Sequence, residues 1–344
     1  MPLEEPSWWY VAGEDDLRVK ALRPISELFG WAAQRRFRRA EPYHSRLPVI
    51  CVGNFTAGGT GKTPLSLMIA ALLKERGATP AFLTRGYSGR QRGPVWVNPA
   101  VDLAREVGDE PLLLARCAPT MVAQDRAKGA QAIEASKTAS HIIMDDGLQN
   151  PSLTKSLIIA VVDGSRGLGN GEVIPAGPLR APIDFQFGLV DTVVVNGDES
   201  GSTLQDLKGA FPGPVLSARV VPNDAAEILK HKRVVAFSGI GNPKRFRASL
   251  DEIGTHVVAA REFKDHHDFT DAEAQELLAL AVASEAQLVT TEKDLARLAG
   301  KTGSCAQLAK TTNVLGIQLA MEPRDLERLV ALVEGACLKE TAPA

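Results

Sequence analysis

One stretch, residues 49–63, constrains the fold more than any other part of this chain. Its sequence is VICVGNFTAGGTGKT, an apolar run followed by closely spaced glycines and then by Lys62 and Thr63 at the start of an apolar-rich segment. This order predicts a buried strand, a glycine-rich loop and a helix. Glycines allow consecutive backbone N–H groups to turn toward an anion, and the helix N-terminus adds a favourable dipole. The stretch therefore predicts a phosphate-binding loop.

The loop also predicts which residues bind a nucleotide. Lys62 is expected at the β- and γ-phosphates, and the Thr63 hydroxyl is expected to bind Mg²⁺. The strict form of the motif has glycine at the position of Thr56, and Gly58 and Gly59 can supply the same flexibility. The expected nucleotide-binding residues are Thr56, Ala57, Gly58, Gly59, Thr60, Gly61, Lys62 and Thr63. The less specific alternative is a glycine-rich turn that binds no ligand.

Composition excludes several classes of protein. Of 344 residues, 44% are hydrophobic and 23% charged, which is typical of a globular protein with one large or two ordinary domains. A net charge of -2 argues against a nucleic-acid partner. The four cysteines are scattered, which suits a reducing compartment. The sequence begins without a secretory signal and has no apolar run near the ~20 residues of a spanning helix. We therefore expect a cytoplasmic protein, or one that lies on a membrane without crossing it.

Residues 1–45 differ from the rest of the chain. Three of the four tryptophans lie here, and apolar residues recur at helical spacing ahead of four arginines at positions 35–39. This pattern predicts an amphipathic helix with Pro24 in its first turn. Such a helix suits an anionic lipid surface. It is equally typical of a surface helix packed on the first domain.

The remaining chain predicts two α/β domains. Residues 46–221 alternate apolar runs with helical stretches, which predicts a parallel sheet with helices on both faces, as in P-loop NTPases. Residues 222–344 repeat the alternation on a smaller scale and predict a second, smaller α/β domain. The strands expected in the first domain are Val49–Val52, Ala81–Thr84, Thr120–Ala123, Ile142–Met144, Leu157–Val162 and Thr192–Val195.

Two acids follow one of these strands. Asp145 and Asp146 end the apolar run 141–144. In a nucleotide-binding sheet, an acid at a strand end reaches Mg²⁺ directly or through water. The alternative is a plain turn residue or helix cap. The phosphate loop upstream favours the metal site, with Asp145 as the first choice.

Three further residues are candidates for chemistry. Asp109 precedes a predicted helix over Leu112–Arg116, so it is either the N-cap of that helix or a general base for an acceptor hydroxyl. His266, one of two adjacent histidines, could orient a catalytic aspartate. Arg180 ends the loop PAGPLR and is either a phosphate contact or a structural arginine.

Several short segments, in this order and spacing, resemble one family. They are GNFTAGGTGKTP, RGY, GDEP, DDGLQ, PAGPLR, SGIGNP, DHHDFT and TTEKD, together with the aromatic and basic N-terminal region. Over most of its length the chain resembles the tetraacyldisaccharide 4′-kinases of lipid A assembly in Gram-negative bacteria. The resemblance implies transfer of the ATP γ-phosphoryl group to the 4′-hydroxyl of tetraacyldisaccharide 1-phosphate, giving lipid IVA, with Mg²⁺ as cofactor. It also implies a peripheral protein on the cytoplasmic face of the inner membrane, with the N-terminal helix at the membrane surface.

The resemblance assigns roles to the candidates. It implies that Asp109 is the catalytic base with His266 as its partner, and that Asp145 and Asp146 are the metal-binding acids. Arg180 becomes a substrate or phosphate contact. Two positions depart from the family pattern: Asn150 stands where the family has histidine and could take its substrate role, and Ala181 stands where an acid usually follows Arg180.

Other functions remain open from the residues alone. One is a P-loop nucleotide switch or metallochaperone without lipid kinase activity. The other is a P-loop kinase that acts on a small soluble acceptor. The lipid-like N-terminal region argues against the second alternative.

Overall fold

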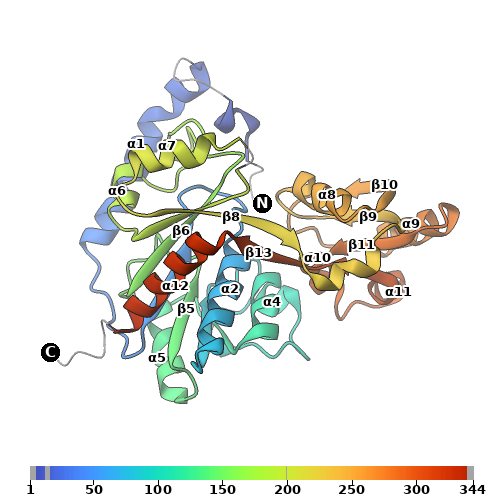
Figure 1. Cartoon of the computed structure of the whole chain (residues 1–344), viewed down its shortest axis with the longest axis horizontal. Helices are drawn as coiled ribbons and strands as arrows, with labels where there is room; N and C mark the ends of the chain where they lie inside the picture. Colours follow the sequence, from blue (N-terminus) through green and yellow to red (C-terminus); the bar gives the residue numbers. More distant parts are fainter. Residues whose placement is uncertain (1–4, 12–15, 199, 339–344) are drawn as a thin grey trace. The chain divides into compact units, whose positions relative to one another are not determined.

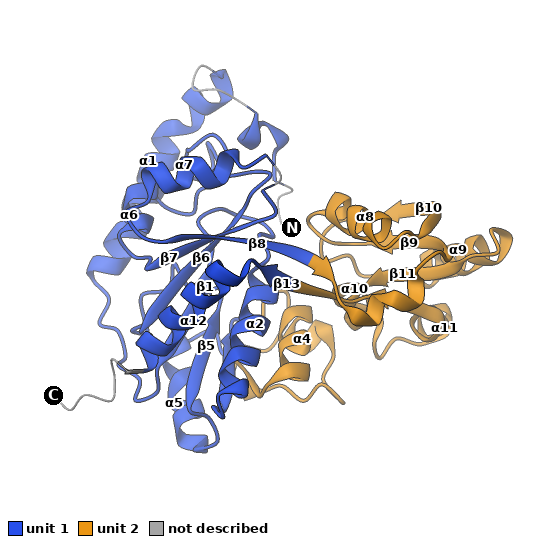
Figure 2. Ribbon diagram, in the orientation of Figure 1, with its two compact units in different colours: residues 1–85, 123–220, 319–344 blue, residues 86–122, 221–318 orange. Residues whose placement is uncertain are grey.

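The computed structural model describes residues 5–11, 16–198 and 200–338, which fall into two compact units (Figure 2). Unit 1 consists of residues 1–85, 123–220 and 319–344, and unit 2 of residues 86–122 and 221–318. These units differ from the domain ranges expected from the sequence. Residues 86–122 group with the later strands and helices, and residues 319–344 group with the phosphate-loop sheet. Each unit is made of segments that are separate in the sequence, so domains predicted as continuous ranges could not match them.

Unit 1 is built on a parallel sheet (Figure 1). Six strands follow the order β8-β7-β6-β1-β5-β2, and each neighbouring pair in this series is parallel. The strands are β1 (Val49–Gly53), β2 (Pro80–Thr84), β5 (His141–Asp145), β6 (Leu157–Asp163), β7 (Thr192–Asn196) and β8 (Val215–Pro222), and β13 (Ile317–Met321) leads back into the unit. The predicted α/β class with a large parallel sheet is confirmed.

The helices of unit 1 pack on this sheet. Phe187 and Phe211 join the apolar cluster that buries β6 and β7 beneath α6 and α7. Burial of such side chains contributes about 1.5–3 kcal/mol each. The helices are η1 (Ser7–Tyr10), α1 (Leu17–Arg38), α2 (Lys62–Glu75), α5 (Arg126–Ser136), α6 (Ile183–Phe187), α7 (Ser202–Ala210) and α12 (Pro323–Leu338).

The register of the sheet places the phosphate loop beside the strand-end acids. In β1, Val52 pairs with Asp145 of β5, and Gly53 pairs with Ala160 of β6. The carboxyl ends of these parallel strands therefore lie at one edge of the sheet, where ligands bind in open α/β folds.

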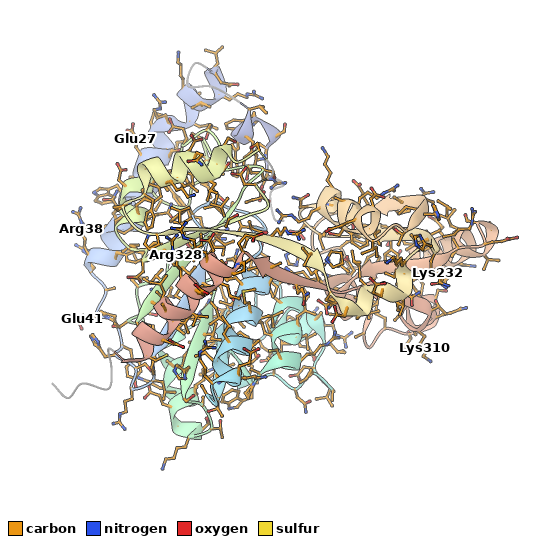
Figure 3. All side chains as sticks on the ribbon, viewed as in Figure 1. Glu27, Arg38, Glu41, Lys232, Lys310 and Arg328 are labelled. Carbon is orange, nitrogen blue, oxygen red and sulfur yellow. The ribbon has the colours of Figure 1, made fainter. Side chains whose placement is uncertain are left out.

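Helix α1 starts earlier than predicted. Asp16 caps it by accepting a hydrogen bond from the N–H of Arg18, so Pro24 lies inside the helix and its expected position in the first turn is wrong. A proline inside a helix removes one backbone hydrogen bond. Further along the helix, Gly30 is buried, and a Cβ there would lie 3.0 Å from Pro182, so α1 packs closely at this point. On the outer side of α1, Glu27 and Arg38 extend away from the helix (Figure 3).

Unit 2 contains a four-stranded parallel sheet of order β10-β9-β11-β12 and a short antiparallel pair of β3 with β4. Thr270 and Glu273 form a capping box at the start of α9. The strands are β3 (Val95–Trp96), β4 (Thr120–Val122), β9 (Arg233–Ser238), β10 (His256–Glu262), β11 (Gln287–Thr291) and β12 (Thr312–Leu315). The helices are α3 (Ala104–Val107), α4 (Asp109–Cys117), η2 (Asp224–Leu229), α8 (Pro243–Glu252), α9 (Asp271–Ala283), α10 (Glu292–Leu298) and α11 (Gly303–Thr311).

One apolar cluster joins the two chain segments of unit 2. Val107 and Leu112 come from the first segment, and Ala296 of α10 comes from the second. The cluster places the start of α4 against α10, so residues far apart in the sequence meet there.

Candidate active site

The phosphate loop has the backbone of an anion-binding turn. Gly58 and Gly61 have φ of 93° and 95°, in the left-handed region that favours glycine. Asn54 Nδ2 donates to the carbonyls of Thr56 at 2.7 Å and Gly58 at 3.2 Å, and Asn196 Nδ2 donates to the carbonyl of Thr60 at 3.0 Å. These bonds hold the loop carbonyls from two strand ends. The N–H groups of residues 58–61 donate to no acceptor within the described part of the chain, so they are available to an anion.

Charged side chains gather at the end of this loop. Asp146 Oδ1 accepts a hydrogen bond from Arg180 Nη1 at 2.8 Å and lies 3.9 Å from Lys62 Nζ. Arg180 Nε also donates to the carbonyl of Thr56 at 3.0 Å. Burial raises the pKa of Asp146, but the charges of Lys62 and Arg180 lower it further, so the net direction is well below the ordinary value. Asp146 is therefore ionised, and it supplies the acidic partner of Arg180 that Ala181 cannot.

Asp145 lies at the start of the loop helix. It is buried, and its Oδ1 accepts a hydrogen bond from Ser66 Oγ at 2.8 Å. Ser66 follows Thr63 by three residues on α2, so Thr63 lies on the helix face whose Ser66 bonds to Asp145. No group of three His, Cys, Asp or Glu side chains in the described residues could hold a metal by itself.

Asn150, the predicted substrate contact, takes part in a turn. Its Oδ1 accepts hydrogen bonds from the N–H of Ser152 at 2.9 Å and from Ser152 Oγ at 2.7 Å. The substrate role of Asn150 stays a prediction.

Arg126 lies near the two acids and was not expected from the sequence. It is buried, and its Nη1 donates to the carbonyl of Ala123 at 2.6 Å. Burial lowers its pKa to about 10, while the charges of Asp146 and Asp145 oppose this shift. It therefore remains a cation. A single arginine after a predicted strand does not indicate that its side chain will lie near these two acids.

Asp109 is the first residue of α4, and Gly108, with φ of 96°, is the N-cap. The alternative in which Asp109 caps the helix is therefore wrong. Its Oδ1 accepts a hydrogen bond from the N–H of Glu110 at 3.0 Å. The side chain is 2% exposed, and a buried carboxylate requires charged or hydrogen-bonding partners.

Two cations supply those partners. Arg297 Nε donates to Asp109 Oδ2 at 2.8 Å, and Arg297 Nη2 contacts the same oxygen. His266 Nδ1 lies 3.3 Å from Asp109 Oδ2, so the expected pair of Asp109 with His266 is present within unit 2. His266 has φ of 57° and packs against the ring of Tyr87 at 5.3 Å between centroids. A non-glycine residue in this backbone conformation is strained, and such strain is common at functional sites.

The charges of this cluster define its protonation. Burial raises the pKa of Asp109, and the hydrogen bond from His266 with the charges of Arg297 and Lys293 lowers it further, so its pKa lies well below the ordinary value. Burial lowers the pKa of His266, but Asp109 raises it more, so its pKa lies above the ordinary value. Both shifts favour an ionised Asp109 beside a protonated His266.

A cavity of about 660 Å³ opens next to this cluster within unit 2. Asp109, His266 and Arg297 line it together with cations from other elements. Those further cations are Arg90, Arg105 and Lys301. A ligand in this cavity would meet the Asp109 carboxylate at its wall.

Arg297 is the main functional candidate that the sequence did not reveal. It lies three residues after Asp294 on α10, within the segment that follows TTEKD. Residues three apart share one helix face, so the spacing of Asp294 and Arg297 predicts only that the two side chains can pair with each other. Nothing in the sequence links this helix to Asp109.

Comparisons with known proteins agree over nearly the whole chain. The family model described as tetraacyldisaccharide-1-P 4′-kinase matches residues 18–334. A tetraacyldisaccharide 4′-kinase of Methylobacterium radiotolerans is 47% identical over 338 residues, which cover 97% of this chain and 99% of that protein. A protein of the same name from Rhodopseudomonas palustris is 47% identical over 300 residues, or 87% of each chain. Among solved structures, an "apo" form of LpxK from Aquifex aeolicus in complex with ATP matches with a TM-score of 0.72 and 26% identity, covering 94% of this chain and 100% of that one.

Proposed function

This chain belongs to the tetraacyldisaccharide-1-P 4′-kinase family and is a kinase of lipid A synthesis, and from that premise we propose how its residues divide the reaction. The donor is ATP, in keeping with the ATP complex of the related structure. The γ-phosphoryl group passes to the 4′-hydroxyl of tetraacyldisaccharide 1-phosphate and gives lipid IVA. The observation that carries this proposal is the glycine loop with free N–H groups next to Lys62, Asp145 and Asp146.

The phosphate loop, residues 56–63, holds the triphosphate. Its free N–H groups and the N-terminus of α2 stabilise the β- and γ-phosphate oxygens. Lys62 adds a point charge, and Arg180 adds a second one close by, since both contact Asp146. Catalysis in phosphoryl transfer is mainly positioning and charge stabilisation, which is what these groups supply.

Thr63, Asp145 and Asp146 are the residues that would hold Mg²⁺. Their hydroxyl and carboxylate oxygens are the ligands that Mg²⁺ prefers, and Mg²⁺ usually combines one or two carboxylates with phosphate oxygens and water. When bound, the ion would neutralise charge on the transferring phosphates.

Asp109 acts as the general base, and His266 orients it. The ionised carboxylate can accept the proton of the acceptor hydroxyl because Oδ1 has capacity beyond its bond from the N–H of Glu110. His266, whose pKa is raised by Asp109, supports the ionised form of Asp109 through the contact of Nδ1 with Oδ2. General-base catalysis contributes typically about 10²–10⁴-fold in rate.

Helix α1 contacts the membrane surface. Leu28 and Trp31 are 64% and 55% exposed, and Leu17, Ile25 and Phe29 are also exposed along the same helix. Its last turns carry Arg35, Arg36 and Arg38. Exposed apolar and aromatic side chains beside a basic cluster suit an anionic lipid surface. No helix in the described ranges is long and apolar enough to span a bilayer. We place the protein peripherally, on the cytoplasmic face of the bacterial inner membrane.

One assay tests the reaction. Purified protein is incubated with ATP, Mg²⁺ and the disaccharide 1-phosphate in mixed micelles, and the lipid product is analysed by mass spectrometry. The expected product is heavier by one phosphate, and Lys62→Ala should abolish it. Nucleotide hydrolysis without a phosphorylated lipid would instead favour a nucleotide switch.

A further inference from the structure

Arg297 connects the two chain segments that meet around Asp109. Its Nη1 donates to Asp294 Oδ1 at 2.9 Å and to the carbonyl of Gly239 at 2.5 Å, while Nε bonds to Asp109. The side chain of Arg297 is 7% exposed. One planar guanidinium therefore spans the start of α4 and the start of α10, which suits the fixed fork geometry of arginine.

The second anchor of the guanidinium is itself fixed. Asp294 accepts hydrogen bonds from the N–H of Gly239 at 3.0 Å and from Thr291 Oγ1 at 2.7 Å, and it is fully buried. Thr291 caps α10. The anchor that Asp294 offers to Arg297 is therefore held by bonds to the backbone of Gly239 and to the cap of α10.

Arg297 and His266 share one oxygen of Asp109. Oδ2 accepts from Arg297 Nε at 2.8 Å and lies 3.3 Å from His266 Nδ1. Oδ1 accepts from the N–H of Glu110 at 3.0 Å and can accept a further hydrogen bond, and Asp109 is itself one of the residues that line the cavity. We propose that Arg297 is a positioning residue for phosphoryl transfer, which turns Asp109 so that Oδ2 meets His266 and Oδ1 is left for the acceptor hydroxyl. This inference rests on the proposed role of Asp109 as base.

Other charged groups face Asp109 as well. Glu110 comes from α4, Lys293 and Asp294 come from α10, and Asp265 lies beside His266. Lys293 is paired with Glu110 through a hydrogen bond of 2.6 Å, and Asp294 is paired with Arg297. Removing Arg297 therefore leaves Asp109 with His266 and with cations that are already paired.

The test compares pH profiles of kcat at saturating ATP and disaccharide 1-phosphate in mixed micelles. Arg297→Gln removes the charge, and an arginine neighbour lowers an aspartate pKa by about 1–3 units. We expect kcat to fall about 10-fold or more, and the acidic limb of the profile to move up by about 1–3 pH units. Arg297→Lys keeps the charge, but a single ammonium group cannot bond to Asp109 and Asp294 in the way the guanidinium does. The acidic limb of its kcat profile should therefore move less than that of Arg297→Gln. Arg247→Gln, which breaks an exposed pair with Asp251 in the same unit, is the matched control and should leave both quantities unchanged.

A residue that served only the stability of the fold would lower kcat equally at every pH. The proposal would therefore be overturned if the acidic limb of the kcat profile stayed at its wild-type pH. One folded Arg297 variant, Gln or Lys, is enough for this comparison. Asp109→Asn is measured alongside. Wild-type kcat in Asp109→Asn would remove the base assignment itself, whereas an inactive Asp109→Asn with an unshifted Arg297→Gln would remove only the role of Arg297.

Discussion

The phosphate loop and the Asp109 cluster are constructed from different parts of the polypeptide. The loop uses backbone N–H groups and glycine dihedral angles within residues 56–63, and three side chains fix it from nearby strand ends and loops. The Asp109 cluster uses buried side chains, and Asp109 and Arg297 are separated by 188 positions in the chain. A site made of backbone is specified by a short motif, whereas a site made of side chains depends on the packing of the whole unit.

The largest effect should come from changing the backbone of the loop. Gly61→Ala places a Cβ 2.2 Å from Nδ2 of Asn196, at a φ of 95° that L-residues avoid. We expect kcat/KM to fall by about 10³ or more, because several phosphate-binding N–H groups are displaced together. Steady-state kinetics and ATP titration calorimetry measure the change.

Gly209→Ala is the matched control for that substitution. Gly209 lies in α7 of the same unit, is exposed and has no positive φ, and a Cβ there has no heavy atom within 4 Å. The same chemical change outside the phosphate loop should therefore alter kcat/KM by less than about threefold. Equal losses in the two variants would show that the loop does not act through its conformation.

Asp109→Asn should have the next largest effect and should separate the two regions. The amide keeps the shape but cannot take a proton, so we expect kcat to fall by about 10²–10⁴. The phosphate loop is unchanged, so ATP affinity should stay within about twofold of the wild type. A wild-type kcat, or a matching loss of ATP affinity, would contradict this division of labour.

The same contrast explains how far the sequence could be interpreted. The strand, loop and helix at residues 49–63 were predicted because the apolar run, the glycines and Lys62 with Thr63 follow one another directly in the chain. Asp145 followed from its place at a strand end, and the register with Val52 agrees. The bond of Arg297 to Asp109 could not be predicted, because it depends on α10 packing against α4. The start of α1 was misplaced because Pro24 was interpreted as a first-turn residue, whereas Asp16 is the N-cap and Pro24 lies inside the helix.

A third, smaller effect concerns the arginines of α1. Each basic residue near an anionic surface contributes about 1 kcal/mol, so Arg35→Gln with Arg38→Gln should weaken vesicle binding by about 30-fold at low salt. Co-sedimentation with vesicles containing anionic lipid measures this, and zwitterionic vesicles are the control. Unchanged binding would favour the alternative in which α1 is an ordinary surface helix.

The smallest expected effect is on stability in acid, and it tests the ionised state of Asp109 without any assay of activity. The pKa of Asp109 in the folded protein lies below its ordinary value of 3.8, so the unfolded chain binds more protons below that pH. The stabilisation is complete above about pH 4 and is lost as pH falls toward the lowered pKa. For one proton, the unfolding free energy of wild type relative to Asp109→Asn should fall by up to about 1.4 kcal/mol per pH unit. Urea unfolding between pH 6 and pH 3 measures the difference. Curves that stay parallel below pH 4 would mean that Arg297 and His266 do not hold Asp109 in its charged form, and the buried cluster would then lose the electrostatic role that separates it from the phosphate loop.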